Sequence, residues 1–390
     1  MKILIVTPKY YPDTFPVNLI AERLVKQGHE VDVLTTVPFL NGKYLKKYDV
    51  GKRLENGVTV NRVRTHIRKK GTLSLIRNYL SLYKGFKKWA KINDKPYDVT
   101  YTYSISPVVA LVAGNIVKKK KLTPHFAHVL DLWPESVVAT KYTSKHSLLY
   151  RILLRWSKKE YQNVSHILVG TKEFEDYLRK VIKVKNIDIS YLAQPGLVYE
   201  DKNKENPYDI NKTNLLYCGN ISKLQLVDKF IPMMEKLNNP NVVLNVLGTG
   251  SYLEEFKNEL KTKNISNIIY HGYFDYKESS KYFKNADAIL VTLKNEGIVG
   301  KTIPNKLISS LYYAKPIIGV VSSGAKDLLV QNGNIVSDED VDSIVNSIYQ
   351  YLKLNKKDVE SIINKNRQTY DDIYSLDKFI KNLLSSFSRK

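Results

Sequence analysis

The residues best suited to chemistry gather between Ile298 and Val321, a stretch that reads IVGKTIPNKLISSLYYAKPIIGVV. Its pattern predicts a glycine-bearing loop, a helix that begins near Pro304, a turn and a buried strand. Proline is tolerated at the first helical position because its missing N–H group would have had no partner there. A helix start offers free backbone N–H groups and a positive dipole end to an anion, and Lys306 adds a full charge. The stretch therefore predicts a phosphate site.

Three more loops follow predicted strand ends in the same half of the chain, at 217–223 (YCGNISK), 247–251 (LGTGS) and 271–274 (HGYF). Gly219 lets the backbone approach a ligand closely, and Lys223 can reach a phosphate. The glycine turn at Gly248 is a weaker sign, because such turns are common in α/β proteins. Backbone groups beyond Gly272 could read the edge of a base. For each loop the alternative is a plain turn between a strand and a helix.

The segment HVLDLWPES in the first half of the chain supplies candidate acid–base groups. Asp131 falls at the end of a predicted strand and could accept the proton of an acceptor hydroxyl, with a helix N-cap as the alternative. Glu135 is balanced between a functional and a structural role. His128 lies within the strand, which favours a packed core residue over an acid–base group.

The elements that must position these residues alternate between strand and helix along the chain, which predicts a doubly wound α/β architecture. Strands are predicted at 2–7, 31–35, 58–65, 98–103, 125–131, 166–170 and 187–192, and again at 214–218, 242–247, 268–271, 288–292, 316–321 and 334–336. A segment rich in proline, glycine and polar residues interrupts the alternation. We therefore predict one domain at 1–195, a linker at 196–212 and a second domain at 213–373. Two such domains would face a cleft and hold ligands beyond the carboxyl ends of their strands.

The charge of the chain is strongly positive and uneven. Its 390 residues carry a net charge of +23, and the segment from Asn41 to Lys95 has sixteen Lys or Arg against three Asp or Glu. A solvated lysine-rich face, an anionic lipid surface and nucleic acid are the three explanations. Nucleic acid is disfavoured because no recognisable nucleic-acid fold or stacking platform accompanies the charge. The predicted helix from Leu73 to Ala90 combines lysines with aromatic residues, which suits a membrane interface.

The cysteine content and the hydropathy of the chain limit its possible cellular locations. The single cysteine, Cys218, excludes a disulfide framework and a cysteine-based metal site. The apolar run at the N-terminus is too short for a signal peptide, and no run is long enough to span a membrane. We expect a cytoplasmic protein that associates peripherally with the inner face of the cell membrane through its basic N-terminal domain.

The order and spacing of these motifs resemble the retaining GT-B glycosyltransferases of the family 4 type, and are most similar to the WbuB-like enzymes of O-antigen and capsule assembly. The resemblance runs through KILIVTPKYYP, GHEVDVLT, HVLDLWPES, YCGNISKLQ, VLGTGSYLEEF and GKTIPNKLISSLYYAKPII. It implies two Rossmann-like domains, the first for an acceptor and the second for a nucleotide-sugar, with the final helix, at 374–390, packed back on the first. It also implies transfer of a sugar, for example an N-acetylated amino sugar, from a UDP-sugar to a polyprenyl-diphosphate-linked saccharide, with no metal and no cofactor.

The resemblance also implies roles for individual residues. Lys223 would neutralise the leaving diphosphate, and with Asp131 it makes up the candidate catalytic pair. The turn at Gly272–Phe274 would take the uracil. The donor-binding residues would be Gly219, Asn220, Gly248, Gly272, Tyr273, Phe274, Thr302, Pro304, Asn305, Lys306, Leu307 and Ser309. The acceptor-side residues would be Pro16, His128, Trp133 and Glu135.

The chain departs from this family in three places, one of which is Leu130, where the acceptor-side histidine is usual. Lys301 and Ser309 stand where many relatives have two glutamates, and Phe15 and Pro16 stand where a pair of glycines is usual. Lys301 cannot accept a hydrogen bond from a sugar hydroxyl. Two alternatives stay open: a non-catalytic GT-B partner protein, and a GT-B sugar-nucleotide 2-epimerase. The epimerase would need acid–base groups that Lys301 and Ser309 do not supply.

Overall fold

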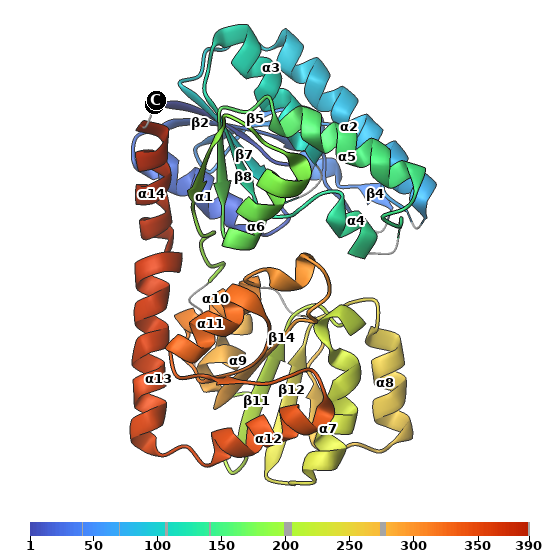
Figure 1. Cartoon of the computed structure of the whole chain (residues 1–390), viewed down its shortest axis with the longest axis vertical. Coiled ribbons are helices and arrows are strands. Elements are labelled where there is room, and N and C mark those ends of the chain that lie inside the picture. Colours follow the sequence, from blue (N-terminus) through green and yellow to red (C-terminus); the bar gives the residue numbers. More distant parts are fainter. Residues whose placement is uncertain are drawn as a thin grey trace. The chain divides into compact units, whose positions relative to one another are not determined.

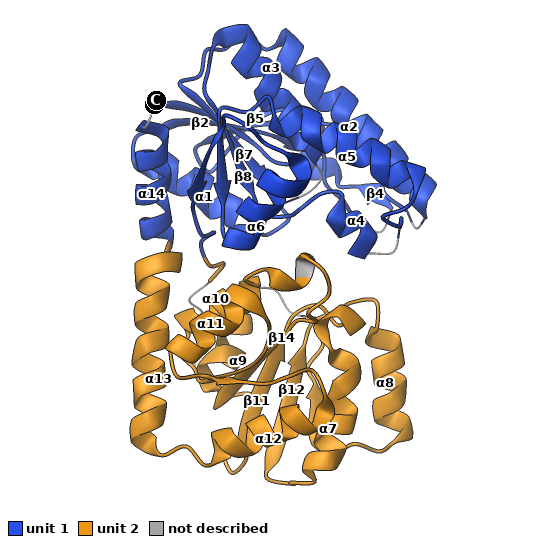
Figure 2. Cartoon of the chain, viewed as in Figure 1, with its two compact units in different colours: residues 1–195, 376–390 blue, residues 196–375 orange. Residues whose placement is uncertain are grey.

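The computed structural model describes residues 1–40, 42–69, 71–105, 108–139, 142–198, 205–273 and 278–388. The chain divides into two compact units (Figure 2). Unit 1 holds residues 1–195 and 376–390, and unit 2 holds residues 196–375. Each unit has its own sheet and its own hydrophobic core.

Unit 1 is built on an eight-stranded sheet (Figure 1). The strand order of this sheet is β10-β9-β8-β7-β1-β2-β6-β5. All neighbouring strands are parallel except β5 and β6, which pair antiparallel at one edge. The inner strand β1 is apolar and buried on both faces, because helices cover both sides of a parallel sheet. The strands are β1 (Lys2–Val6), β2 (Glu30–Thr36), β5 (Gly51–Glu55), β6 (Val58–Val63), β7 (Val99–Ser104), β8 (His125–Val129), β9 (His166–Val169) and β10 (Asp188–Tyr191), with a separate hairpin of β3 (Phe39–Leu40) and β4 (Lys43–Tyr44).

Helices cover the two faces of this sheet with different partners. On one face α1 and the C-terminal helix α14 pack on Ile3 and Ile5 of β1. On the other face α2 and α3 pack on Leu4 and Val6 of the same strand, because successive side chains of a strand point to opposite faces. The helices are α1 (Pro16–Lys26), α2 (Thr72–Ile92), α3 (Leu111–Lys121), α4 (Glu135–Ala139), α5 (Leu148–Tyr161), α6 (Lys172–Tyr177) and α14 (Leu376–Ser388).

Unit 2 is built on a six-stranded parallel sheet with the strand order β13-β12-β11-β14-β15-β16. The order reverses between β11 and β14, which are neighbours in the sheet although two strands separate them in sequence. The strands are β11 (Thr213–Cys218), β12 (Val242–Leu247), β13 (Ile268–Tyr270), β14 (Ala288–Thr292), β15 (Ile317–Val320) and β16 (Ile335–Val336). In open α/β sheets this reversal point is where ligands bind.

The helices of unit 2 also cover both faces of its sheet. α7, α8 and α12 pack on one face around Leu215, Leu244 and Ile318. Gly319 of β15 points to the other face, where α11 packs so closely that a Cβ atom would lie 2.2 Å from Leu329 Cδ1. The helices are α7 (Phe230–Leu237), α8 (Leu253–Thr262), α9 (Ser279–Asn285), α10 (Asn305–Tyr312), α11 (Ser323–Gln331), α12 (Val341–Leu352) and α13 (Lys356–Thr369).

The predicted strands agree with those found to about two residues at each end, and the short strands β3, β4 and β5 were not predicted. The described parts of the predicted linker, 196–198 and 205–212, belong to unit 2, and residues 199–204 lie outside the described residues. The final helix packs on unit 1, where Phe379, Ile380 and Leu383 are fully buried.

Candidate functional site

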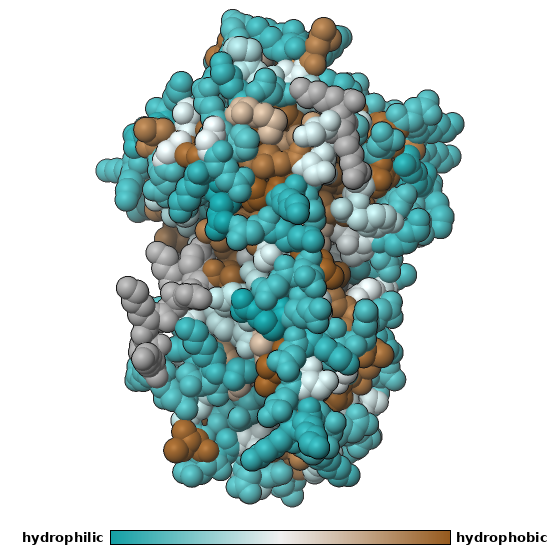
Figure 3. Space-filling model, turned by 90° about the vertical axis from the view of Figure 1, so that its left-hand side faces the viewer, coloured by the Kyte–Doolittle hydropathy of each residue, from teal (hydrophilic) through white to brown (hydrophobic). Residues whose placement is uncertain are grey.

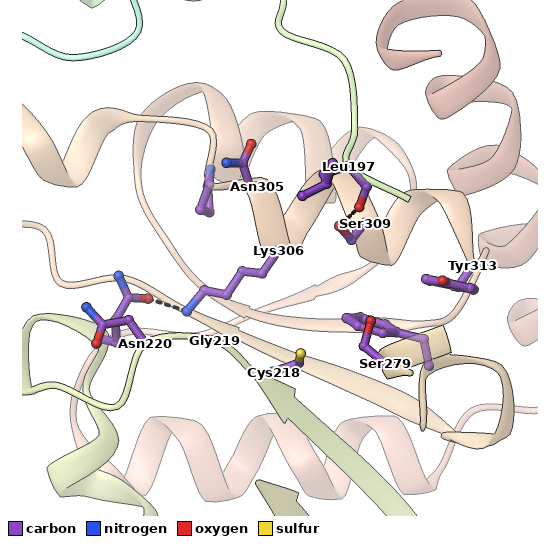
Figure 4. Close-up of a pocket in the computed structure, with 12 residues that line it drawn as sticks. Leu197, Cys218, Gly219, Asn220, Ser279, Asn305, Lys306, Ser309 and Tyr313 are labelled. Carbon is purple, nitrogen blue, oxygen red and sulfur yellow. Dashed lines mark hydrogen bonds between the residues drawn. The ribbon is translucent and has the colours of Figure 1, made fainter. Parts of the chain in front are cut away.

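A pocket of about 310 Å³ opens in unit 2 where the strand order reverses. Its walls come from the loop after β11 and from the start of α10, which follows β14 (Figure 4). The carboxyl ends of parallel strands meet at one edge of a sheet, so segments far apart in sequence converge there. The lining residues are Leu197, Cys218, Gly219, Asn220, Gln225, Ser279, Phe283, Pro304, Asn305, Lys306, Ser309 and Tyr313. Six of the residues predicted to bind the donor are among them: Gly219, Asn220, Pro304, Asn305, Lys306 and Ser309.

Lys306 is the charged side chain of this pocket. It extends from the first turn of α10 toward the loop that carries Asn220 (Figure 4). Its Nζ atom donates hydrogen bonds to the Gln225 side-chain oxygen and to the Thr292 carbonyl oxygen. The same atom lies 4.7 Å from the centre of the Tyr217 ring. The ammonium group is thus held by neutral oxygens and a ring face.

The electrostatics of the pocket favour an anionic ligand. Burial lowers the pKa of Lys306 from its usual 10.5 to about 7. Burial raises the pKa of the neighbouring Cys218 thiol well above its usual value, so this group is neutral. None of the lining residues is an aspartate or a glutamate. A bound anion would therefore supply an opposite charge that no described lining residue gives to Lys306.

The backbone of three strand-end loops is tied together beside the pocket. Gly219 N–H donates to the Leu247 carbonyl oxygen at 3.0 Å, and Gly248 N–H donates to the Gly272 carbonyl oxygen at 3.0 Å. Gly248 has a φ of +139°, and a Cβ atom there would lie 1.8 Å from the Gly219 carbonyl oxygen. A glycine is therefore required at position 248 for the loops after β11 and β12 to approach each other closely. This contact holds the loop after β11, which carries the lining residues Gly219 and Asn220.

The start of α10 forms part of the pocket lining. Pro304 is the N-cap residue rather than the first helical residue, and no side chain caps the helix. Asn305 and Lys306 then follow in the first turn, where backbone N–H groups have no intrahelical acceptor. Ser309, one turn later, is buried and donates to the Leu197 carbonyl oxygen at 3.4 Å.

Lys223 lies outside the pocket lining. It begins the short helical turn at Lys223–Gln225, and its side chain is exposed. Its Nζ atom lies 3.2 Å from a carboxylate oxygen of Glu255 and 4.9 Å from the centre of the Tyr252 ring. A diphosphate ligand would have to compete with Glu255 for this lysine.

The other residues predicted to bind the donor take different positions. Gly248, Gly272, Tyr273, Thr302 and Leu307 do not line the pocket. Leu307 is fully buried in the core, and Tyr273 is largely exposed. Phe274 lies outside the described residues.

Sequence reasoning missed several pocket residues. Gln225 follows Lys223 by two positions, yet it is the partner of Lys306. Phe283 of α9 and Tyr313 stack with ring centroids 4.9 Å apart and form one side of the pocket. Gln225 lay within the quoted YCGNISKLQ motif, and no sequence pattern marked Phe283 or Tyr313.

Unit 1 has a pocket of its own, of about 330 Å³, at the carboxyl ends of its central strands. Its polar lining includes Lys9, Asp13, Arg68 and Asn78, and the ring of Tyr79 adds an apolar wall. The remaining lining residues are Pro8, Tyr10, Phe15, Thr36, Pro38, Phe39, Thr65, Leu82 and Ile105.

Of the residues predicted on the acceptor side, Trp133 contacts the lining residue Tyr79, and Glu135 contacts side chains outside the lining. The indole ring of Trp133 is buried and meets the rings of Tyr79 and Trp156 edge to face. The buried carboxylate of Glu135 accepts hydrogen bonds from Tyr150 at 2.7 Å and Tyr177 at 3.2 Å. The other oxygen of Glu135 lies 3.2 Å from Lys145 Nζ. Glu135 is thus held in place from three sides.

Asp131 and Pro16 remain candidates with different surroundings. Asp131 lies two residues beyond β8 and is half-buried, and its charge raises the pKa of the nearby Tyr161 hydroxyl after the larger effect of burial. Pro16 is the first residue of α1 and is buried. Neither residue lines the unit 1 pocket.

His128 is removed from the acceptor-side set, because it has no exposed surface. Its Nδ1 atom lies 2.7 Å from the Tyr101 hydroxyl, and its Nε2 atom lies 3.0 Å from the Leu192 carbonyl oxygen. Its ring stacks on Phe379 of α14. Burial lowers the pKa of His128 to about 4, so it is a neutral packing residue at pH 7.

The described part of the chain shows neither a metal-binding cluster nor a membrane-spanning helix. No group of three or more His, Cys, Asp or Glu side chains in the described ranges is arranged to hold a metal ion. No helix of the described chain has the length and apolar character needed to cross a membrane.

Comparison with known families gives two matches that together span most of the chain. Residues 16–193 match the glycosyl transferase 4-like domain. Residues 198–369 match the family described as glycosyl transferases group 1. The boundary between the two matches falls close to the boundary between unit 1 and unit 2.

Two curated relatives are each 24% identical to the chain. One is the probable glycosyltransferase WbjE of Pseudomonas aeruginosa, aligned over 206 residues that cover 51% of each chain. The other is an uncharacterized 41.2 kDa protein in the cps region of Klebsiella pneumoniae, aligned over 254 residues that cover 57% of this chain and 61% of that protein. The chain thus spans about half to three fifths of the length of these relatives.

Solved structures resemble the whole chain at low identity. Sucrose-phosphate synthase from Thermosynechococcus elongatus has a TM-score of 0.75 at 14% identity, covering 100% of this chain and 98% of that one. HepE of Anabaena in complex with UDP-glucose has a TM-score of 0.69 at 13% identity and full coverage of both chains. WaaG, a glycosyltransferase involved in lipopolysaccharide biosynthesis, has a TM-score of 0.65 at 15% identity and full coverage of both. These likenesses confirm the predicted GT-B fold with two Rossmann-like units.

Proposed function

Because residues 198–369 of this chain belong to the glycosyl transferases group 1 and residues 16–193 to the glycosyl transferase 4-like domains, we propose that the chain transfers a sugar from a nucleotide-sugar to a saccharide acceptor. The observation that carries the proposal is the unit 2 pocket. There, Lys306 has no carboxylate partner among the residues that the structure describes, and it lies in the first turn of α10, which no side chain caps, at the point where the strand order reverses. This combination is suited to the diphosphate of a nucleotide-sugar.

The donor in this proposal is a UDP-sugar. The diphosphate would accept hydrogen bonds from Lys306 and from the first backbone N–H groups of α10. The uracil would lie at the turn beginning at Gly272. The HepE structure in complex with UDP-glucose supports a uridine donor through its similar fold. The transferred sugar, for example an N-acetylated amino sugar, would lie toward Asn220.

The reaction in this proposal is retaining, with front-face displacement of the diphosphate. Positioning and stabilisation of the leaving group dominate such a reaction. Before the donor binds, Lys223 Nζ lies 3.2 Å from the Glu255 carboxylate. On donor binding, Lys223 would leave Glu255 and contact the leaving diphosphate. Asp131 would orient the attacking acceptor hydroxyl or accept its proton. Lysines and a helix start would take the place of a metal ion.

The acceptor in this proposal is a polyprenyl-diphosphate-linked saccharide in capsule or O-antigen assembly. The unit 1 pocket supports it, because Arg68 suits phosphate while Tyr79 offers a ring face to a sugar. The relative in the cps region and the fold of WaaG support a role in surface polysaccharide. The protein would work at the cytoplasmic face of the membrane, where such lipid-linked saccharides are extended.

A donor screen tests the proposal. Thermal unfolding of the full chain is measured with UDP-, GDP- and dTDP-sugars, and with UDP after treatment with EDTA. We expect stabilisation by UDP and UDP-sugars that EDTA does not reduce, since binding of ligand to the native state raises its stability. A shift with GDP-sugars alone would overturn the choice of uridine. No shift with any nucleotide would instead favour a non-catalytic partner protein.

A further inference from the structure

Two neighbouring helices of unit 1 expose aliphatic side chains where helices of a sheet protein usually expose polar ones. α2 and α5 are neighbours, because the rings of Tyr83 and Trp156 meet edge to face with centroids 5.3 Å apart (Figure 1). Leu73 is 62% exposed and Leu80 46% exposed on α2. Leu148 is 69% exposed and Ile152 49% exposed on α5. Such side chains lose free energy in water unless another surface covers them.

Seven cations share the outer sides of the same helices. At helical spacing from Leu73 and Leu80, α2 exposes Arg77, Lys84, Lys88 and Lys91. At helical spacing from Leu148, α5 exposes Arg151, Arg155 and Lys159. We name these seven cations and the four aliphatic residues the α2/α5 face.

The positive charge of the α2/α5 face is not balanced by acids on its helices. α2 contains no aspartate or glutamate at all. α5 contains one, Glu160, which is buried and accepts hydrogen bonds from Asn115 and Trp156. A partner with negative charge therefore meets an attractive surface along both helices.

An anionic lipid surface fits this combination better than nucleic acid does. Lipid headgroups meet the cations, and the boundary between headgroups and acyl chains takes the aliphatic side chains. Nucleic acid would need aromatic rings on which bases can stack. The rings on these helices are half-buried (Tyr79, Tyr83, Trp89 and Trp156) or buried (Phe86, Tyr150 and Tyr161). Tyr83 and Trp156 contact each other. The exposed apolar residues of the face are all aliphatic.

We propose that the α2/α5 face docks unit 1 on a membrane surface rich in anionic lipid, with Leu73, Leu80, Leu148 and Ile152 among the headgroups. The inference rests on the proposed function in one respect: it names the surface through which the protein would meet a lipid-linked acceptor. α2 would serve both purposes. Its outer side contacts lipid, and Asn78, Tyr79 and Leu82 on its inner side line the unit 1 pocket.

Vesicle sedimentation of the full chain tests the proposal. The vesicles consist of phosphatidylcholine with or without phosphatidylglycerol. The wild-type chain should sediment with the anionic vesicles and much less with the neutral ones. Each cation near an anionic surface contributes roughly a fivefold gain in partitioning. The triple variant Arg77→Gln, Lys84→Gln, Lys88→Gln should therefore bind anionic vesicles at least ~10-fold more weakly.

Two further variants separate the face from charge in general. Lys356→Gln, Lys357→Gln, Lys365→Gln makes the same change in net charge on α13 of unit 2, along which hydrophilic residues predominate (Figure 3), and should bind vesicles like the wild type. Leu80→Ser with Ile152→Ser keeps every charge and should still weaken binding, because the aliphatic contacts are lost. Circular dichroism and thermal unfolding verify that each variant folds.

Three outcomes would overturn the proposal. The wild-type chain could fail to bind anionic vesicles, or the α2 triple variant could bind as tightly as the α13 variant. Binding of duplex DNA without binding of vesicles would assign the face to nucleic acid instead. The stabilisation of each variant by UDP is measured in parallel, because that site lies in unit 2. If the α2 triple variant loses vesicle binding but is stabilised by UDP like the wild type, the lipid face is supported. If UDP does not stabilise even the wild type, only the proposed function is refuted.

Discussion

Lys306 makes binding of the donor diphosphate depend on pH in a window where an ordinary lysine would not titrate. Its pKa is about 7 in the ligand-free pocket, against a usual 10.5. A bound diphosphate favours the charged form and raises that pKa, so binding is coupled to uptake of a proton. The affinity for UDP should accordingly fall as the pH rises above 7, because less of the free protein carries the charge.

The magnitude follows from the fraction of Lys306 that is protonated. With a pKa of about 7, that fraction is about one half at pH 7 and roughly 1% at pH 9. The dissociation constant of UDP should therefore rise roughly 50-fold between pH 7 and pH 9, which is about 2.3 kcal/mol. The charge of the diphosphate group of UDP is nearly constant in this range, because a phosphate loses its second proton near pH 6.

Isothermal titration calorimetry at pH 7, 8 and 9 measures this dependence, and buffers with different enthalpies of ionisation report the proton uptake. Lys306→Arg is the matched control, since arginine stays charged at every pH in the series and should show a flat profile. Lys306→Met should bind UDP weakly and without proton uptake. A flat wild-type profile, or an equal slope in Lys306→Met, would refute the reasoning.

The same lowered pKa of Lys306 predicts that the stability of the ligand-free protein rises with pH, whereas its affinity for UDP falls. Between pH 7 and 10.5 the unfolded chain binds more protons at this position than the folded chain does, so the stability of the wild type rises with pH. Lys306→Met removes this contribution, which is at most about 5 kcal/mol. The variant should gain stability over the wild type as the pH falls from 10.5 to 7, as measured by urea denaturation without ligand.

Three further predictions concern other sites. Gly248→Ala should abolish the stabilisation by UDP, because its Cβ atom would lie 1.8 Å from the Gly219 carbonyl oxygen. In the control Gly324→Ala the added Cβ atom meets no atom within 4 Å, so the stabilisation by UDP should be retained. Equal UDP shifts in the two variants would contradict the loop geometry. Lys223→Ala should abolish sugar transfer while UDP binding persists, and transfer within about threefold of the wild type would remove this lysine from the leaving-group role. The pKa of His128 in the folded protein is about 4, below its usual 6.5. The wild type should therefore lose about 3 kcal/mol of stability as the pH falls from 6.5 to 4, and His128→Gln should not show this loss. Parallel pH profiles of the two proteins in urea denaturation would contradict this account.

The sequence by itself determined the architecture, since strand and helix periods are local. The alternation of buried strands and amphipathic helices predicted the two α/β units. The glycines after β11 and β12 and the proline before α10 marked the edge of the unit 2 sheet where a ligand binds. These signals depend on neighbours within a few residues, which a single sequence displays directly.

The tertiary structure alone decided which of the candidate residues share a site. Lys223 and Lys306 read alike in the sequence as lysines beside a phosphate loop. In the structure Lys306 lines the pocket and bonds to Gln225, while Lys223 is paired with Glu255 outside the lining. The reason is the pairing of β11 with β14, which brings α10 against the loop after β11 across a gap of more than eighty residues.

The same reason explains the correction at His128. Its place in β8 was visible in the sequence, but α14, from the far end of the chain, covers it and stacks Phe379 on its ring. Burial depends on what packs against a residue, and packing partners that are distant in sequence leave no local pattern. The types of residue and their order therefore came from the sequence, whereas exposure, pKa and the grouping of side chains came from the fold.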